Sequence, residues 1–407
     1  TPSPAVSARL RERMGAAAVT AARSIGYHGA GTVEFLLDQS GDFFFLEMNT
    51  RLQVEHPVTE MVTGIDLVAW QIAVAQGDAL PLDQEQVSLS GWAIEARLYA
   101  EDPENGFMPS AGRVQRLDLP DFDGVRIDTG VVEGNEASPH YDPMLAKIIA
   151  HGETRDIARQ RVIRALQNMV LLGPKTNRGF LIKALGHSEF AKGKATTAFV
   201  ETYFPPQELE TPSQPQLNVA LAAAVLYVAA AANTRPRLTR SAHYLFSQKN
   251  RPMKVQVSRV DQGLSVQVDQ QVFGFESFGF DGRTWRAVCE GGMTSGAAHI
   301  NGRSEIWLED NGYVLHLRDL SQTSAVESQV GDPGQVCAPM HGRLVEVRVD
   351  VGDVLTKDQP VLVLEAMKMQ HVLLAGQGGV LGTLRATVGE QVEAGQILAE
   401  IIENATA

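Results

Sequence analysis

The chain has 407 residues, of which 44% are hydrophobic and 20% are charged, a composition typical of globular proteins that build several hydrophobic cores. Its formal net charge is −13, from 35 basic and 48 acidic side chains, which argues against nucleic acid or an anionic membrane as a partner. With only Cys289 and Cys337, the sequence excludes a disulfide framework and favours a reducing compartment.

Local signals near the start predict a helix followed by a β-hairpin. Apolar and alanine residues at helical spacing predict a helix over residues 7–25, which ends at Gly26. Residues 31–37 and 42–47 are strand-like, and the Asp-Gln-Ser-Gly segment between them is a hairpin signal. Such a hairpin would bring Glu34 opposite Glu47.

A run of polar side chains at every second position follows the second strand. Its members are Glu47, Asn49, Arg51, Gln53 and Glu55. Alternate side chains of an extended chain share a face, and such a face is usually the solvated side of an edge strand. Glu34 on the neighbouring strand favours a site instead. Glu47 and Asn49 lie about 7 Å apart along a strand, and together with Glu34 they offer the hard oxygen ligands that suit magnesium and a nucleotide phosphate.

Glu55 is too far from Glu47 to share that site if the strand stays straight. Eight residues of extended chain span about 26 Å. We therefore expect the chain to curl after Arg51, so that Arg51, Gln53 and Glu55 line a pocket beside the metal ligands. His56-Pro57 would end the extended run.

Residues 47–64, Glu-Met-Asn-Thr-Arg-Leu-Gln-Val-Glu-His-Pro-Val-Thr-Glu-Met-Val-Thr-Gly, resemble the signature of biotin carboxylases of the ATP-grasp superfamily. The resemblance implies Mg²⁺ or Mn²⁺ bound with ATP by Glu34, Glu47 and Asn49. It implies a bicarbonate-binding group made of Arg51, Gln53, Val54 and Glu55. Glu55 would be the base that deprotonates bicarbonate for attack on the γ-phosphate, and Arg51 would steady bicarbonate and biotin.

The next elements place one further candidate. Residues 58–76 are expected to be helical with a break near Gly64 and with Val68 and Ile72 on one apolar face. Residues 92–99 alternate as a strand that carries Arg97. A strand arginine is usually a salt-bridge partner, but residues 95–103 resemble the segment in which the biotin carboxylase arginine stabilises the biotin enolate. The resemblance thus gives Arg97 a catalytic role.

Two expected helices, 154–172 and 176–185, close the first domain. The resemblance to biotin carboxylases covers about residues 1–204, so we place this domain at 1–205. Residues 206–216 have the composition of a linker.

Residues 217–320 predict a helix wrapped by an antiparallel barrel. A helix over 217–232 precedes six alternating segments, from 253–259 to 313–318, that are separated by Gly, Asp and Asn turns. The apolar run in this helix is shorter than the roughly 20 residues that a membrane span needs. By its position the domain resembles the middle domain of acyl-CoA carboxylase α subunits, which contacts the carboxyltransferase β subunit. A second linker is expected at 321–334.

The last domain, residues 335–407, contains an internal repeat. A shift of 37 positions lays Gly342 on Gly379 and Leu344 on Leu381. Two β half-units should therefore pack into one flattened barrel or sandwich. The Ala-Met-Lys-Met tetrad lies between the halves, where a hairpin turn would expose Lys368, and methionines are unusual beside an exposed lysine.

The segment Glu365-Ala-Met-Lys-Met369 resembles the biotin attachment sequence of biotin carboxyl carrier domains, which share their fold with lipoyl domains. The resemblance implies covalent biotin on Lys368 and a biotin protein ligase as a partner. One difference is that residues 338–342 read Ala-Pro-Met-His-Gly, where the family often has a second proline.

Together these features predict a multidomain chain with three parts. They are the α+β C-terminal part of an ATP-grasp biotin carboxylase, a helix with an antiparallel β-barrel, and an all-β biotinyl domain. The implied function is ATP-dependent carboxylation of biotin by bicarbonate, followed by transfer through Lys368 to a separate carboxyltransferase acting on an acyl-CoA. Tethering the carrier on the same chain raises its effective concentration. A hetero-oligomer is expected in the cytoplasm, or in the mitochondrial matrix of a eukaryote.

Three alternatives bear on that function. Because the first half of the family has no counterpart before Thr1, we expect a C-terminal fragment that is inactive alone. A non-catalytic biotin carrier and assembly module, from a carboxylase or a decarboxylase pump, would have no use for the polar group in residues 31–64. Pyruvate carboxylases place a long transferase barrel before the carrier, and the segment between the first domain and the carrier is too short to hold one, so this family is disfavoured. The sequences of residues 106–112 and 140–144 resemble those of methylcrotonoyl-CoA or geranyl-CoA carboxylase α subunits more than those of propionyl-CoA carboxylases.

Overall fold

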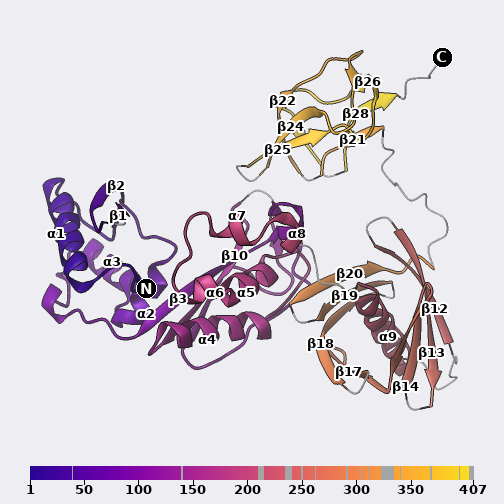
Figure 1. Ribbon diagram of the computed structural model, residues 1–407, viewed down its shortest axis with the longest axis horizontal. Coiled ribbons are helices and arrows are strands. Elements are labelled where there is room, and N and C mark those ends of the chain that lie inside the picture. Colours follow the sequence, from indigo (N-terminus) through magenta and orange to yellow (C-terminus); the bar gives the residue numbers. More distant parts are fainter. Residues whose placement is uncertain are drawn as a thin grey trace.

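The computed structural model contains helices and strands along the whole chain (Figure 1). It describes residues 1–38, 40–138, 141–209, 215–233, 241–248, 251–261, 263–289, 292–302, 304–310, 312–321, 334–339, 341–366, 369–393 and 395–402. Three separate clusters of buried apolar side chains lie along it, one for each of the three predicted parts. The predicted multidomain fold class is confirmed.

The first elements are local and match the sequence signals. Helix α1 (Ala8–Ser24) is followed by the antiparallel pair β1 (Thr32–Leu37) and β2 (Phe43–Asn49). Helices α2 (His56–Thr63) and α3 (Leu67–Gln76) follow, bent by 96° from each other. The break falls at Gly64, which has a φ of 72° that glycine adopts without strain.

The apolar faces of this region are not covered by the described residues. Five large side chains of β2 and α3 are more than two-fifths exposed: Phe44, Phe45, Leu46, Val68 and Ile72. The apolar face expected on α3 is therefore present but faces outward. Across the described ranges no single helix is long and apolar enough to cross a bilayer, although α2 and α3 taken together reach that length and composition.

A three-stranded antiparallel sheet, ordered β3-β10-β8, lies at the centre of the next part. Its strands are β3 (Trp92–Tyr99), β10 (Met144–Gly152) and β8 (Val125–Thr129). Helix α4 (Arg155–Asn168) covers one face, where Leu98, Ile148 and Leu166 are fully buried. Because strand side chains alternate, the residues between them point to the opposite face, against which α2 packs.

Short elements complete this part. They are η1 (Gln84–Gln86), β4 (Glu101–Asp102), η2 (Pro103–Asn105), β5 (Met108–Pro109), β6 (Gly112–Arg113), β7 (Arg116–Asp118), β9 (Glu136–Ala137), β11 (Val170–Leu172), α5 (Arg178–Gly186), α6 (Ser188–Ala191), α7 (Phe199–Tyr203) and α8 (Pro206–Leu209). The predicted helix 154–172 was too long, since its last three residues form β11, which pairs with β7. Residues 206–209, expected in a linker, form α8.

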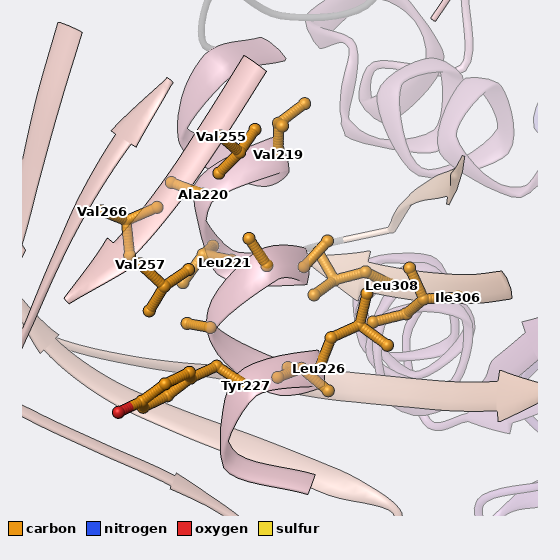
Figure 2. Packing of buried hydrophobic residues seen from close by; sticks show 14 of the residues in the cluster. Val219, Ala220, Leu221, Leu226, Tyr227, Val255, Val257, Val266, Ile306 and Leu308 are labelled. Carbon is orange, nitrogen blue, oxygen red and sulfur yellow. The ribbon is translucent and has the colours of Figure 1, made fainter. Parts of the chain in front are cut away.

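The middle part encloses helix α9 (Pro215–Asn233) between two antiparallel sheets. The first is β12 (Ser241–Gln248), β13 (Arg251–Val260), β14 (Gly263–Val268) and β15 (Gln271–Phe275). The second is β16 (Ser277–Phe280), β17 (Thr284–Cys289), β18 (Gly292–Asn301), β19 (Glu305–Asp310) and β20 (Tyr313–Arg318). Figure 2 shows α9 side chains such as Leu221 and Leu226 between strands of both sheets. A helix that is apolar on all sides suits such an enclosed position.

The C-terminal part confirms the internal repeat. One sheet has the order β21-β28-β26-β23 and the other β25-β24-β22-β27, so the shift of 37 converts each sheet into its partner. The strands are β21 (Gln335–Cys337), β22 (Gly342–Val347), β23 (Val354–Leu355), β24 (Pro360–Ala366), β25 (Met369–Leu374), β26 (Gly379–Leu384), β27 (Gln391–Val392) and β28 (Ile397–Ile402). Leu344 and its repeat mate Leu381 are both fully buried.

A buried ion pair joins the first two parts. Arg178 of α5 lies with its Nη2 2.8 Å from Oε1 of Glu309 at the end of β19, and their side chains are only 1% and 8% exposed. The same oxygen accepts a hydrogen bond from the backbone N–H of Gly312 at 2.8 Å. Nearby, Arg116 of β7 donates to the carbonyl oxygens of Arg283 and Ala298. Both arginines therefore connect the first part, through α5 and β7, to the β16–β20 sheet.

We predict that Glu309→Ala lowers the free energy of unfolding by about 3–5 kcal/mol, because it leaves the Arg178 guanidinium buried without a counter-charge. Urea unfolding followed by tryptophan fluorescence measures this loss. Removing both charges, in Arg178→Met with Glu309→Leu, should restore much of it. Lys192→Ala, which breaks an exposed pair with Glu189, should leave the transition in place. A Glu309→Ala chain as stable as the parent would contradict the structural role of this pair.

Candidate active site

The hairpin gathers three acidic and amide side chains at its open end. Glu34 and Glu47 are directly paired across β1 and β2. Nδ2 of Asn49 lies 2.8 Å from Oε1 of Glu34 and 3.0 Å from Oε1 of Glu47. The three residues named by the sequence as metal ligands are therefore side by side.

Their chemistry fits a divalent cation. The two carboxylates converge on one amide, and within the described part of the chain neither forms an ion pair with a basic side chain. Turning the amide of Asn49 would present its oxygen, which gives three hard oxygen donors. Among the described residues, no three His, Cys, Asp or Glu side chains are arranged to hold a metal ion. The group at the hairpin has only two carboxylates, and its third donor is the amide of Asn49.

The chain curls after β2, as expected. Only Glu47 and Asn49 of the alternating polar run belong to the strand, which ends at Asn49. The turn that follows returns Gln53, whose Nε2 donates to Oε1 of Glu34 at 2.9 Å. A single carboxylate oxygen thus links the metal-ligand group to the turn.

Lys147 holds this turn against the central sheet. Its Nζ donates to the carbonyl oxygen of Val54 at 3.1 Å and lies 3.2 Å from Oδ2 of Asp128. The side chain is only 12% exposed. No role was predicted for Lys147, because its position opposite Arg97 becomes visible only when β3 and β10 are paired.

Glu55 and Arg97 form the outer part of the site. Glu55 stands just before α2, and its Oε2 accepts a hydrogen bond from Nη2 of Arg97 at 2.6 Å. These side chains are 49% and 37% exposed, so the pair is open to solvent. Two residues 42 positions apart in the sequence are thereby joined, and both had been named as catalytic candidates.

A second ion-pair group fixes α2 to the sheet. Nη1 of Arg126 lies 2.6 Å from Oε2 of Glu60 on α2, and its Nε lies 2.7 Å from Oδ1 of Asp128. Burial alone would raise the pKa of Asp128, but hydrogen bonds from Arg126 and Lys147 hold that pKa below its ordinary value. The start of α2, and with it Glu55, is therefore held to the same sheet as Arg97.

Two candidates are not joined to this group by the described contacts. Arg51 is exposed, and its Nη1 lies 3.3 Å from the carbonyl oxygen of the next residue, Leu52. Lys368 lies outside the described residues. The flanking strands β24 and β25 are paired as far as Ala366 and Met369, so the tetrad does connect the two halves of the repeat.

A well-defined cavity lies elsewhere. It has a volume of about 450 Å³ and is lined from both sides of the junction between α5 and β20. Its walls include Lys175, Phe180, Tyr313 and His316. None of the described candidate residues lines it. The Glu55 and Arg97 side chains are instead open to solvent.

Three family models match consecutive parts of the chain. Residues 1–83 match the ATP binding domain of the carbamoyl-phosphate synthase L chain, and residues 95–202 match the biotin carboxylase C-terminal domain. Residues 334–401 match the family described as biotin-requiring enzyme. The first match contains the residues from Glu34 to Glu55, the second contains Arg97, and the third contains Lys368.

Curated relatives align over nearly the whole chain. The mitochondrial methylcrotonoyl-CoA carboxylase subunit alpha of Oryza sativa is 37% identical over 99% of this chain and 62% of its own length. That of Rattus norvegicus is 35% identical over 99% and 60%. The propionyl-CoA carboxylase alpha chain of Ruegeria pomeroyi is 34% identical over 98% and 64%. The chain spans about three fifths of the length of these relatives.

Solved structures share the fold. The biotin carboxylase domain of Hydrogenobacter thermophilus 2-oxoglutarate carboxylase, in complex with MgADP, ADP and bicarbonate, has a TM-score of 0.50 and 40% identity over 52% of this chain and 47% of its own. The multifunctional pyruvate carboxylase of Rhizobium etli has a TM-score of 0.51 and 34% identity over 60% and 24%. In this chain, a biotin carboxylase C-terminal domain precedes a domain of the biotin-requiring family. The chain is therefore a homologue of biotin-dependent acyl-CoA carboxylase α subunits.

Proposed function

We propose that this chain activates bicarbonate with ATP and passes the carboxyl group to biotin on Lys368, as part of an acyl-CoA carboxylase α subunit. The observation that carries the proposal is the Glu55–Arg97 ion pair. Lys147 holds the turn after β2, and Arg126 holds helix α2, to the sheet that carries Arg97. The same turn contacts Glu34 through Gln53. A base, a fixed cation and a set of metal ligands thus share one open surface.

The turn would hold bicarbonate through Arg51, Gln53, Val54 and Glu55. Arg51 is exposed and offers a planar guanidinium, which suits a planar anion of this kind. Arg97 engages only Oε2 of Glu55 among the described contacts, so Oε1 is available to accept the proton of bicarbonate. Arg97 stays charged at any physiological pH and would stabilise negative charge that develops on biotin.

The metal ligands would bring ATP to the same surface. Held by Glu34, Glu47 and Asn49, Mg²⁺ or Mn²⁺ supplies positive charge that binds the phosphates of ATP. The complex of the Hydrogenobacter thermophilus domain with MgADP and bicarbonate supports binding of a metal nucleotide and bicarbonate by this part of the chain. Gln53 contributes by hydrogen bonding to Glu34, which keeps the bicarbonate turn against the metal ligands.

The carrier and the partner complete the reaction. Biotin, attached to Lys368 by a biotin protein ligase, supplies the ureido nitrogen that takes up the carboxyl group. The names of the relatives, which are alpha subunits of mitochondrial methylcrotonoyl-CoA carboxylases, support a second subunit as the partner and 3-methylcrotonoyl-CoA as the acyl-CoA. We propose that this partner is the carboxyltransferase β subunit, and that the protein works in the cytoplasm, or in the mitochondrial matrix of a eukaryote. We assign residues 1–205 to carboxylation, 217–320 to contact with the β subunit and 335–407 to the carrier, with linkers at 206–216 and 321–334.

The second candidate function is a biotin carrier and assembly module without catalysis. It would account for the biotinyl domain and for the enclosed helix α9. It would leave the convergence of Glu34, Glu47 and Asn49 without a purpose. Binding of bicarbonate and of metal ions therefore separates the two functions.

We predict that the full chain binds bicarbonate and that Arg51→Gln weakens binding about tenfold, because a charge-assisted contact is lost. Line broadening of ¹³C-bicarbonate in the presence of the protein measures the affinity. Arg348→Gln is the matched control, since that arginine is also exposed and pairs with Glu346 in the biotinyl domain. Equal binding by the Arg51→Gln chain and its parent would favour the carrier module.

We also predict that Mn²⁺ binds at the hairpin and that Glu47→Gln weakens it about tenfold, because one of two carboxylate charges is removed. The electron paramagnetic resonance signal of free Mn²⁺ gives the bound fraction without ATP. Glu85→Gln, an exposed glutamate remote from the hairpin, should bind as the parent does. If both variants bind alike, Glu34, Glu47 and Asn49 are not the metal ligands.

A further inference from the structure

A buried carboxylate lies behind the candidate site. Glu95 is on β3, two residues before Arg97 and therefore on the same face of the strand. Its side chain is only 5% exposed, and neither of its carboxylate oxygens accepts a hydrogen bond from the described residues. Burying a charge in this way is costly unless the charge has a purpose or a partner.

Two cations lie around Glu95, and both have other carboxylate partners. Lys147 on the neighbouring strand is held by the carbonyl oxygen of Val54 and by Asp128. Among the described residues, Arg97 is the cation that forms an ion pair with Glu95, and its Nε lies 3.7 Å from Oε1 of Glu95. Burial raises the pKa of Glu95, Lys147 and Arg97 lower it, and the charges of Glu55 and Asp128 raise it further.

Arg97 is therefore shared between two carboxylates of different character. Nη2 is 2.6 Å from the exposed Glu55, whereas Nε is 3.7 Å from the buried Glu95. The first contact is a hydrogen bond and the second is longer than one. Electrostatic attraction is screened less in the buried position, so Glu95 attracts the guanidinium strongly whenever Glu55 does not.

The proposed reaction changes that balance. The O–H bond of bicarbonate breaks, its proton forms a new O–H bond with Oε1 of Glu55, and the electron pair stays on the bicarbonate oxygen. Glu55 then carries no charge, and its attraction for Arg97 falls. Arg97 would be free to turn into solvent at the moment when negative charge is to be stabilised.

We propose that Glu95 is a positioning residue for Arg97, onto whose carboxylate the guanidinium Nε closes when Glu55 gains a proton. The guanidinium then keeps its place on β3 through the proton transfer. The roles of Glu55 and Arg97 rest on the proposed function, but the sharing of the guanidinium between two carboxylates does not.

The test uses the full chain with Glu55→Gln, which imitates the neutral carboxyl group. Exchange of the Arg97 Nε–H proton with water is measured by NMR of protein labelled with ¹⁵N-arginine, and Arg97→Lys assigns the signal. We expect exchange in Glu55→Gln to slow about tenfold, because Nε–H now donates to a charged carboxylate. Adding Glu95→Gln should abolish the slowing.

Glu101→Gln, added to Glu55→Gln, is the matched control. Glu101 is a partly buried carboxylate near Arg97 in the sequence but outside its described contacts, and here the slowing should persist. Absence of slowing in Glu55→Gln, or its persistence when Glu95→Gln is added, would overturn the proposal. Should Glu95→Gln fail to fold, Glu95→Asp keeps the charge and should reduce the slowing by withdrawing the carboxylate. No bicarbonate, ATP or biotin is present, so the result is independent of the binding experiments above.

Discussion

The candidate site depends on one nearly buried lysine. Lys147 donates to the carbonyl oxygen of Val54 and pairs with Asp128, which in turn binds Arg126. These contacts fasten the turn after β2 to the β3-β10-β8 sheet, and the antiparallel register sets Arg97 directly opposite Lys147. Without this cation, the carbonyl oxygen of Val54 would lose its partner and Asp128 would lose one of its two, and the turn would no longer be held beside Arg97. The arrangement of base and guanidinium follows from this contact.

Local signals in the sequence were sufficient for the hairpin, and long-range contacts were not. The turn between β1 and β2 is a local feature, so the pairing of Glu34 with Glu47 could be predicted. Glu55 and Arg97 were named as candidates only through the family resemblance, and their ion pair was not predicted, because it depends on the packing of α2 against β3. The role of Lys147 and the burial of Glu95 require the register of β3 and β10. Residues 170–172 continue a helical pattern, but their pairing with β7 makes them a strand.

The remaining parts follow from two simpler constraints. An entirely apolar helix must be enclosed, and α9 is enclosed by two sheets. The buried Arg178–Glu309 pair joins one of them, the β16–β20 sheet, to α5 of the first part. The C-terminal repeat produces two equivalent sheets whose connection carries the Ala-Met-Lys-Met tetrad. Activation of bicarbonate and transport of the carboxyl group are thus assigned to separate folding units of one chain. Their tethering makes the encounter between them intramolecular.

We propose that this chain carries its own biotin, and the intact mass of the protein produced with a biotin ligase tests this proposal. We expect one added biotinyl group in the parent and in Lys357→Arg, which changes another lysine of the same domain, and none in Lys368→Arg. An unmodified parent with a folded C-terminal domain, or a Lys368→Arg chain that still gains the group, would show that Lys368 is not the attachment site.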